Sequence, residues 1–325
     1  MRVLSGIQPT GDIHVGNYVG AIRHWVAGQH DQDAFIFIAD LHALTVPRDP
    51  AEVRDKTLEA AMVLLASGID PETCTLFVQS HVPEVSELGW LLNCVATTGE
   101  LSRMTQYKEK AKGKESVTVG LFDYPVLQAA DILVYGADRV PVGDEQRQHV
   151  ELCRDIAIRF NGRYGDTFVV PEVAIAKVGA RIMDLQRPTN KMSKSASSPQ
   201  GLLVLLEPPE SMTRKIMRAV TDAETEVRYD REAKPGVSNL LELLAVAPGG
   251  DPHALAGRYE RYGDLKSDTA AAVVEFLRPV QERFAEVAAD PAGVVKILDR
   301  GAEQARSVAA GTLARAKAAM GLLPR

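Results

Sequence analysis

A polar segment rich in glycine follows the first apolar run of the chain. It reads Gly6-Ile7-Gln8-Pro9-Thr10-Gly11-Asp12-Ile13-His14-Val15-Gly16-Asn17. The pattern around it predicts a strand before it and a helix after it, a junction where helix N–H groups favour phosphate binding. Gly16 would let a nucleotide approach the backbone closely, and His14 and Asn17 can donate hydrogen bonds to phosphoryl oxygens. These residues indicate a nucleotide site, although a capped turn explains the Thr-Gly-Asp part better when that part is taken alone.

A second polar segment has the sequence Lys191-Met192-Ser193-Lys194-Ser195. Its two ammonium groups, set among hydroxyls, suit the charge of a departing pyrophosphate. A loop of this kind can close over charge that develops in a transition state. An ordinary basic surface loop would look the same, so the segment is weak evidence alone. Together the two segments are specific, because each predicts the place of the other in one fold.

Alternating strand and helix patterns predict the framework that positions these residues. The predicted strands are Arg2–Ile7, 34–39 and 73–79, and the predicted helices cover about 15–28, 51–67 and 84–95. Strand–helix–strand alternation implies a parallel sheet with right-handed crossovers. The predicted fold class is therefore α/β, a Rossmann-type doubly wound parallel sheet.

The second half of the chain has a different pattern. Beyond about residue 185 the strand pattern fades, and from Pro208 onwards helices predominate, broken at 234–236, 248–250 and 290–291. We therefore expect a second, smaller, all-helical domain over 186–290, after a nucleotide-binding domain over 1–185. The last helix, within 291–325, is amphipathic and is expected to dock back on the first domain.

Composition excludes several classes of protein. Charged residues make up 25% and hydrophobic residues 46%, which is typical of a globular chain and not of a disordered one. The sequence shows neither a signal peptide nor a membrane-spanning run, so we expect a cytoplasmic protein without a membrane partner. Cys74, Cys94 and Cys153 are odd in number and far apart, which disfavours a disulfide framework and a zinc-finger-type site.

The net charge of −6 argues weakly against a protein coated by nucleic acid, but basic segments exist. Residues 108–114 carry four lysines against one glutamate, and the tail after Glu303 has basic residues and no acid. Each segment fits a nucleic-acid contact and a solvated helix face equally well.

The two polar segments carry a family resemblance. They resemble the "HIGH" and "KMSKS" signatures of class I aminoacyl-tRNA synthetases of the tryptophanyl/tyrosyl branch. The run 6–11 with Asn17 resembles the tryptophanyl members, whereas tyrosyl members more often show an Asp-Pro-Thr-Ala start and a second histidine. The likeness runs nearly end to end and includes Met104–Lys108, Ala129–Leu133, Val140–Gly143, Gly179–Met183 and Arg228–Gly236.

The resemblance implies an ATP site and a set of catalytic residues. The implied ATP-binding residues are Gln8, Pro9, Thr10, Gly16, Asn17, Gly143, Asp144, Glu145, Ile182, Lys191, Met192, Ser193, Lys194 and Ser195. The implied catalytic residues are Lys191, Lys194, His14, Asn17 and Lys110, of which Lys110 resembles a lysine that contacts ATP phosphates. Mg²⁺ would be held mainly by phosphates and water, so no protein metal-ligand set is expected.

The resemblance also implies a tryptophan site. Gln8, His42, Tyr124 and Gln146 would hold the ammonium and carboxylate, and Asp131 would accept the indole N–H. The side-chain pocket would include Val140, Val142 and Leu4. From the residues alone, an acid in the apolar run around Asp131 is either a paired buried group or a ligand contact. His42 follows a strand at its ligand-binding end, and a structural histidine is the alternative.

The implied reaction is a two-step ligation. The carboxylate of L-tryptophan attacks the α-phosphate of ATP, which gives tryptophanyl-adenylate and releases pyrophosphate. A terminal ribose hydroxyl of tRNA(Trp) then attacks the adenylate and AMP leaves. Positioning and charge stabilisation would supply most of the catalysis. A homodimer is also implied, and a stripe of Leu88, Leu91 and Leu92 could face a partner, although core packing explains it equally well.

Three other functions compete with this one. A tyrosyl enzyme would use the same scaffold, with the acid accepting a phenol O–H. A non-catalytic RNA-binding or regulatory protein on a synthetase fold is disfavoured by the presence of both signature lysines with His14 and Asn17. A nicotinamide-dependent dehydrogenase is disfavoured because the glycine-rich fingerprint after the first strand is missing.

The sequence departs from the family pattern at three places. The family usually has Gly-Glu-Asp-Gln where this chain has Gly143-Asp144-Glu145-Gln146, so the second acid is one methylene longer. Gln128 stands where many relatives have methionine, and Leu4 where some have phenylalanine. These differences concern the ribose contact by Glu145 and the packing of the side-chain pocket.

Overall fold

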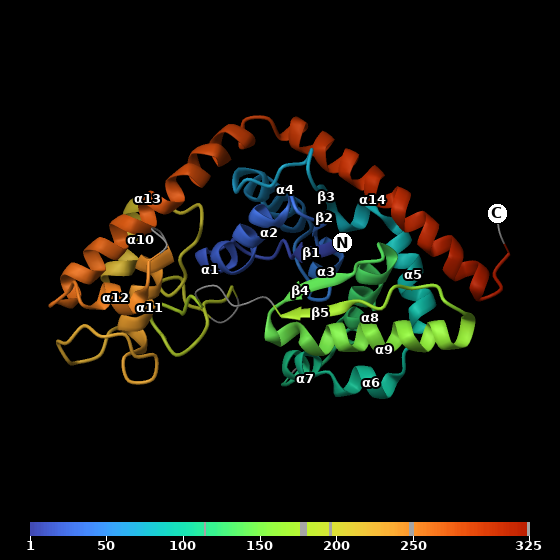
Figure 1. Cartoon of the computed structure of the whole chain (residues 1–325), viewed down its shortest axis with the longest axis horizontal. Helices are drawn as coiled ribbons and strands as arrows, with labels where there is room; N and C mark the ends of the chain where they lie inside the picture. Colours follow the sequence, from blue (N-terminus) through green and yellow to red (C-terminus); the bar gives the residue numbers. More distant parts are fainter. Residues whose placement is uncertain (114, 176–180, 195–196, 247–249, 324–325) are drawn as a thin grey trace.

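The chain folds around one parallel β-sheet. The computed structural model describes every residue except 114, 176–180, 195–196, 247–249 and 324–325. The sheet has five strands in the order β3-β2-β1-β4-β5, and all their pairings are parallel (Figure 1). The strands are β1 Arg2–Ile7, β2 Asp33–Ile38, β3 Thr75–Val78, β4 Arg139–Val142 and β5 Glu172–Ile175. The predicted α/β fold class is confirmed.

The strand order places a ligand crevice beside β1. The chain moves outward from β1 to β2 and β3 on one side, and then returns to β4 and β5 on the other. In open α/β sheets, such a change of direction leaves a crevice at the carboxyl ends of the central strands. The segment that follows Ile7 begins at this crevice.

The predicted helix over 15–28 forms with one irregularity. It consists of α1 (Val15–Asn17), a π-helical turn η1 (Tyr18–Ile22) and α2 (Arg23–Gly28), which follow each other without a break. A π-turn widens the helix locally and is frequent near functional sites. Here it directly follows the glycine-containing segment.

Helices cover both faces of the sheet. Leu4, Phe35 and Phe37 pack in one apolar cluster with α5 (Pro83–Asn93), α8 (Val119–Val134) and α9 (Arg147–Tyr164). Ile36 and Ile38 belong to the other cluster, with the first helix and α4 (Pro50–Ala66). The remaining short elements of this half are α3 Asp40–Ala43, η2 Gln79–His81, α6 Thr98–Arg103, α7 Thr105–Ala111 and η3 Asp144–Gln146.

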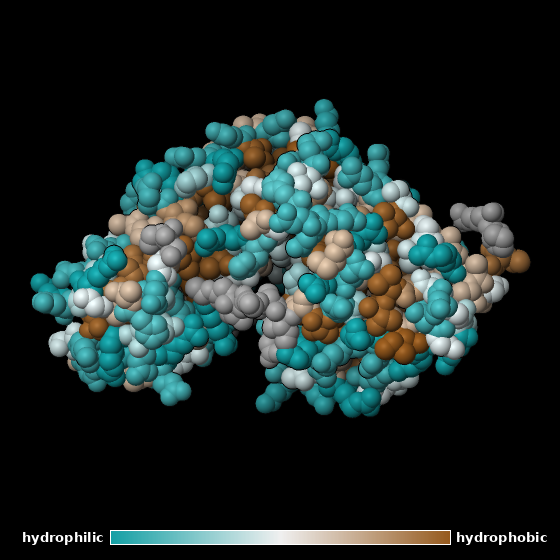
Figure 2. Space-filling model, in the orientation of Figure 1, coloured by the Kyte–Doolittle hydropathy of each residue, from teal (hydrophilic) through white to brown (hydrophobic). Residues whose placement is uncertain are grey.

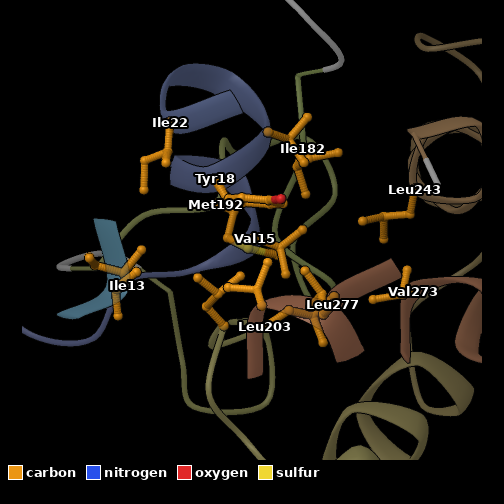
Figure 3. Close-up of a cluster of buried hydrophobic side chains, with 14 of the residues drawn as sticks. Ile13, Val15, Tyr18, Ile22, Ile182, Met192, Leu203, Leu243, Val273 and Leu277 are labelled. Carbon is orange, nitrogen blue, oxygen red and sulfur yellow. The ribbon is translucent and has the colours of Figure 1, made fainter. Parts of the chain in front are cut away.

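Among its described residues, the second half has helices joined by irregular segments, with two isolated β-bridges. Its helices are α10 Pro209–Met217, α11 Pro235–Val246, α12 Pro252–Ala256, α13 Tyr262–Ala288 and α14 Pro291–Ala319. The long helix α13 runs from the helical part towards α4 (Figure 1). Figure 3 shows how the two halves meet, with Leu277 of α13 beside Val15 and Leu203 and with Val273 nearer Leu243.

The last helix, α14, lies along the sheet half of the molecule. It packs against β3 and α5 (Figure 1). A Cβ atom on Gly301 would lie 1.9 Å from the backbone oxygen of Leu76, so only glycine permits this approach. The helix therefore touches the backbone of the edge strand β3 directly.

The leucine stripe on α5 does not face a partner. Leu88, Leu91 and Leu92 are all buried in the apolar cluster of this chain. The suggestion that the stripe faces a partner is therefore wrong, because the stripe is core packing beneath α8. Trp90 lies elsewhere on the same helix and is 70% exposed.

The surface differs between the two parts of the molecule. Figure 2 shows mainly hydrophilic side chains over the helical part, at the left, and apolar patches over the sheet part. Among the helices that the structure describes, none combines the length and hydropathy that crossing a bilayer requires.

Candidate active site

His14 and Asn17 cap the first helix reciprocally. The N–H of Asn17 donates to Nδ1 of His14, and the N–H of His14 donates to Oδ1 of Asn17, both at 3.3 Å. Because Nδ1 accepts, a neutral His14 carries its proton on Nε2. A Cβ atom on Gly16 would lie 3.0 Å from the His14 ring, so glycine keeps this corner open. The cap fixes the orientation of both side chains.

Electrostatics keeps His14 neutral. Burial, together with the nearby charges of Lys194 and Lys191, lowers the pKa of His14 to about 4. At neutral pH the imidazole is therefore a hydrogen-bond donor through Nε2 and not a cation. The sequence expectation of a donor at this position agrees with this state.

The second polar segment lies beside the first. Met183 and Lys191 form an isolated antiparallel bridge, and the N–H of Met192 donates to the oxygen of Ile182 at 3.1 Å. We call residues 182–194 the lysine hairpin. Ile182 and Met192 are buried beside Val15 (Figure 3). This packing holds the lysines of the hairpin next to the helix that His14 and Asn17 cap.

Lys194 reaches the turn of the first segment. Its Nζ donates to the backbone oxygen of Gly11 at 3.4 Å, and Gly11 has a positive φ of 61°. Burial lowers the pKa of Lys194 to about 8. A cation that is partly desolvated before ligand binding is poised to gain from a phosphate partner.

Lys191 pairs with Glu145 across the crevice. Its Nζ lies 3.3 Å from Oε1 of Glu145, and both side chains are 53% exposed. Burial works against ionisation of Glu145, but a backbone hydrogen bond and Lys191 outweigh it, so the pKa of Glu145 is lowered. Glu145 thus brings a carboxylate against a lysine of the hairpin.

Asp131 lies in a buried polar network. Its Oδ2 is 2.8 Å from Nε2 of His42, and Nε2 of Gln79 donates to Oδ1 and Oδ2 at 2.8 and 2.9 Å. Gln79 is oriented in turn, because its Oε1 accepts from the N–H of Leu41 at 3.1 Å. Burial raises the pKa of Asp131, whereas His42 and Gln79 oppose that shift. The structure therefore joins His42 and Asp131, which the sequence singled out separately.

Tyr124 belongs to a neighbouring network. Its hydroxyl lies 2.8 Å from Nε2 of His149, and its ring packs edge-on to His42 with centroids 6.4 Å apart. Nζ of Lys110 lies 4.8 Å from the centroid of the Tyr124 ring. Burial lowers the pKa of His149 to about 4 and raises that of Tyr124 to about 12, so both are neutral at pH 7.

Sequence reasoning missed Gln79 and His149. Gln79 directly follows β3, and polar residues at the carboxyl ends of parallel strands are a usual signal of a ligand site. His149 lies three positions after Gln146, near the start of α9. Its burial comes from packing between α8 and α9, which no local pattern reveals.

The remaining expected site residues lie around these networks. Gln128 donates from Nε2 to Oε1 of Gln146 at 3.5 Å. Leu4 and Val140 are buried in the cluster on the α8 side of the sheet, and Val142 packs against it. Gln8 is exposed, Thr10 is half-buried and Pro9 is buried. A Cβ atom on Gly143 would lie 2.5 Å from the Glu145 carboxylate. Ser195 and the side chain of Asp144 lie outside the described part of the chain.

The arrangement suits nucleotide and amino-acid chemistry. The neutral donor His14 lies near Lys191 and Lys194, and a buried acid on α8 contacts His42 and Gln79, which follow β2 and β3. Cations and fixed dipoles of this kind stabilise charge that develops on phosphoryl oxygens. No group of three or more potential metal ligands occurs among the described residues.

Comparison with known proteins identifies the family. Residues 1–278 match the model of the tRNA synthetases class I (W and Y). The chain is 55% identical over 327 residues to tryptophan–tRNA ligase 1 of Streptomyces avermitilis, covering 99% of each chain. It is 52% identical over 326 residues to the tryptophan–tRNA ligase of Caldanaerobacter subterraneus subsp. tengcongensis, covering 100% of this chain and 99% of the relative.

Solved structures agree with the sequence comparison. The tryptophanyl-tRNA synthetase of Mycoplasma pneumoniae superposes with a TM-score of 0.91 at 35% identity, covering 99% of this chain and 98% of the other. The enzyme of Campylobacter jejuni, complexed with ADP and tryptophan, gives a TM-score of 0.86 at 35% identity, covering 99% and 100%. The chain therefore belongs to the class I tRNA synthetases of the W and Y family, and its activity is the ligation of tryptophan to tRNA.

Proposed function

We propose that the crevice beside β1 activates tryptophan with ATP and that Asp131 reads the indole N–H. The observation that carries this proposal is the hydrogen-bond pattern at Asp131. An ionised carboxylate offers about four lone-pair positions. Three are used by the contacts from His42 and Gln79, which leaves one acceptor for a ligand. The two protein donors would hold the carboxylate in the orientation that an indole N–H requires.

Tyr124, His42, Gln146 and Gln8 hold the amino-acid ends of the substrate in this proposal. Tyr124 and His42 are in edge-to-face contact, so a ligand held by one is near the other. The 2.8 Å contact between Nε2 of His149 and the hydroxyl of Tyr124 would fix the orientation of the tyrosine side chain. Leu4, Val140 and Val142 would contact the indole rings.

ATP occupies the first segment and the lysine hairpin in this proposal. Neutral His14 donates from Nε2 to a phosphoryl oxygen, and Gly16 leaves space for the nucleoside. Lys191 and Lys194 neutralise the charge that grows on the leaving pyrophosphate. Lys191 would exchange its contact with Glu145 for phosphate, so Glu145 is released to approach the ribose. Lys110 would approach the phosphates from α7.

Mg²⁺ accompanies ATP in this proposal. The hairpin and the first segment present cations and N–H groups, which suit phosphate oxygens and not a metal ion. Mg²⁺ keeps much of its water shell and binds readily through substrate phosphates. The residues therefore fit a metal that phosphates hold, and its chemistry would be to neutralise phosphate charge.

We assign catalysis and tRNA anticodon binding to different parts of the chain. Residues 1–185 with the C-terminal segment 291–325 form the catalytic domain, and residues 186–290 form the loop with Lys191 and Lys194 and an anticodon-binding domain for tRNA(Trp). The packing of α14 on β3 and α5 supports the first assignment. We place the enzyme in the cytoplasm, where tRNA is charged.

The proposal includes a homodimer, which now rests on exposed apolar side chains and not on the leucine stripe of α5. Trp90, Leu44 and Val119 are exposed apolar side chains, and Trp90 and Leu44 line one hollow of about 390 Å³ with Gly89 and Gly120. Exposed aromatic residues of this kind mark interaction sites. Light scattering at micromolar concentration is expected to show a dimer, and a Trp90→Glu variant is expected to be a monomer.

The ligand complex tests the proposed site directly. Crystals with tryptophan and a non-hydrolysable ATP analogue should place the indole nitrogen within hydrogen-bond distance of an Asp131 oxygen. The phosphates should lie against Lys191 and Lys194. Tryptophan bound with its indole away from Asp131 would refute the assignment.

A further inference from the structure

The outer edge of the lysine hairpin needs a hydrogen-bonding partner. Met183 and Lys191 face each other between two backbone hydrogen bonds, from Met192 to Ile182 at 3.1 Å and from Asp184 to Asn190 at 2.9 Å. In such an antiparallel pair, the central residues direct their own N–H and C=O groups away from each other. The polar backbone groups of Met183 therefore point outward, where burial would be costly without a partner.

Asn239 of α11 supplies both missing bonds. The N–H of Met183 donates to Oδ1 of Asn239 at 2.8 Å, and Nδ2 of Asn239 donates to the oxygen of Met183 at 3.0 Å. Asn239 is only 2% exposed. Its amide pairs with the backbone of Met183 as a neighbouring strand would. Among side chains of this size, only the amide offers a donor and an acceptor together, since aspartate lacks the donor.

A second contact joins α11 to the first arm of the hairpin, the part that contains Met183 and Leu185. The N–H of Val220 donates to the oxygen of Leu185 at 2.8 Å. A Cβ atom on Gly236, at the start of α11, would lie 2.1 Å from the oxygen of Val220. The helix therefore packs directly on the backbone that holds Leu185. Asn239 and Val220 together join the first arm of the hairpin to the helical part of the chain.

The second arm of the hairpin carries Lys191 and Lys194. Its register depends on the first arm through the Met183–Lys191 bridge. We propose that Asn239 is a positioning residue for tryptophan activation, which holds the lysine hairpin in register so that Lys191 and Lys194 reach the pyrophosphate. This inference rests on the proposed role of the two lysines. It makes the helical part of the chain a contributor to the first chemical step.

Loss of Asn239 should loosen the hairpin without unfolding the chain. Ile182 and Met192 remain packed in the apolar cluster with Val15, Leu203 and Leu243 (Figure 3). That packing does not depend on the amide. A displacement of the lysines by about 1 Å is enough to slow a charge-stabilised step by up to about 10²-fold.

The experiment compares Asn239→Ala and Asn239→Asp with the matched control Thr269→Val. Thr269 is fully buried in the same half of the chain, and its Oγ1 donates at 3.4 Å to the backbone oxygen of Leu240, the residue after Asn239 on α11, and not to the hairpin. The single-turnover rate of adenylate formation and the Kd for tryptophan are measured for each variant. The aspartate variant keeps the volume and the acceptor but loses the donor to the oxygen of Met183, so it tests that hydrogen bond separately.

We expect both Asn239 variants to form adenylate at least about 10-fold more slowly, with the Kd for tryptophan changed by less than about twofold. Thr269→Val should leave both values near those of the wild type. The loss should also depend on the lysines: in a Lys191→Ala/Lys194→Ala background, Asn239→Ala should change the rate by less than about threefold.

Two results would overturn the inference. One is an Asn239 variant whose activation rate matches that of Thr269→Val. The other is a triple variant, with Lys191, Lys194 and Asn239 all replaced by alanine, in which the loss from Asn239→Ala multiplies in full with that of the lysine substitutions, because Asn239 would then act independently of the lysines. An unchanged rate in Lys194→Ala alone would instead refute the proposed role of that lysine, and the inference with it.

Discussion

His42 and Asp131 are in direct contact inside the sheet domain. Nε2 of His42 lies 2.8 Å from Oδ2 of Asp131, and the two side chains are 7% and 2% exposed. Each residue had a structural and a ligand-binding interpretation in the sequence. The contact shows that these interpretations are compatible, because a buried acid that selects a ligand needs a protein donor to hold it in place.

The first prediction concerns this contact. His42→Ala removes one donor from the buried carboxylate, so we expect the free energy of unfolding to fall by about 1–3 kcal/mol. The Kd for tryptophan should rise as the carboxylate loses its fixed orientation. Chemical denaturation and equilibrium dialysis measure the two effects.

A matched control is His30→Ala. His30 is exposed and outside this network, so its replacement should change stability by no more than about 0.5 kcal/mol. Equal behaviour of the two variants would show that the contact with Asp131 contributes nothing.

The second prediction concerns Lys194. Lys194→Ala removes a cation that reaches the turn at Gly11, so the rate of tryptophan activation should fall by roughly 10²-fold or more. Tryptophan affinity should change little, because the amino acid binds elsewhere. Single-turnover ATP cleavage provides the rate. Lys296→Ala, an exposed lysine on α14, should be indistinguishable from the wild type, and an unchanged rate in Lys194→Ala would contradict the role.

The third prediction is a pH profile. Because burial lowers the pKa of Lys194 to about 8, the free enzyme loses this charge as the pH rises through that value. The kcat/KM for ATP, which reports the free enzyme, should therefore fall above about pH 8. In Lys194→Arg the guanidinium stays charged, so the alkaline fall should disappear even if the overall rate is lower. A fall that persists unchanged in the arginine variant would assign it to another group.

The fourth prediction tests the docking of α14. Gly301→Ala forces a Cβ atom into the backbone oxygen of Leu76, so we expect a loss of about 1–3 kcal/mol in stability. Gly311 lies on the same helix, and a Cβ atom there would meet only Arg315 at 3.9 Å. Gly311→Ala should be neutral or stabilise by up to about 1 kcal/mol through helix propensity. Thermal denaturation separates the two, and equal effects would show that the close approach to β3 carries no energy.

Local sequence patterns predicted the elements with strong periodicity. β1 and β2 are apolar runs, and the helices α4 and α5 begin at Pro50 and Pro83, where proline is favoured. β4 and β5 were not predicted: β4 contains Pro141, which disfavours a strand, and β5 lacks a continuous apolar run like that of β3. Their strand conformation comes from pairing with β1 and with each other, which is tertiary information.

The site was predictable to a similar extent. Motif spacing singled out His14 and Lys194, and the fold brings their segments together. Motif spacing could not reveal that Lys191 contacts Glu145 or that Gln79 donates to Asp131, because these pairs join residues far apart in sequence. The leucine stripe on α5 shows a second limit of sequence patterns: helical spacing predicts an apolar face but does not distinguish core packing from a subunit interface.

The central claim is that Asp131 selects tryptophan through the indole N–H. The most direct test is the ratio of kcat/KM for tryptophan to that for an analogue with benzothiophene in place of indole, in the wild type and in Asp131→Ala. A site built to bond a ligand N–H leaves its acceptor unpaired when the analogue lacks that group.

The account predicts that Asp131→Ala lowers this ratio on the order of 10²-fold or more, and weakens discrimination against phenylalanine similarly. Loss of folding would reduce both substrates together and would leave the ratio unchanged. Equal losses of kcat/KM for tryptophan and for the benzothiophene analogue would therefore contradict selection through the indole N–H. Asp131 would then have only a structural role, in its network with His42 and Gln79.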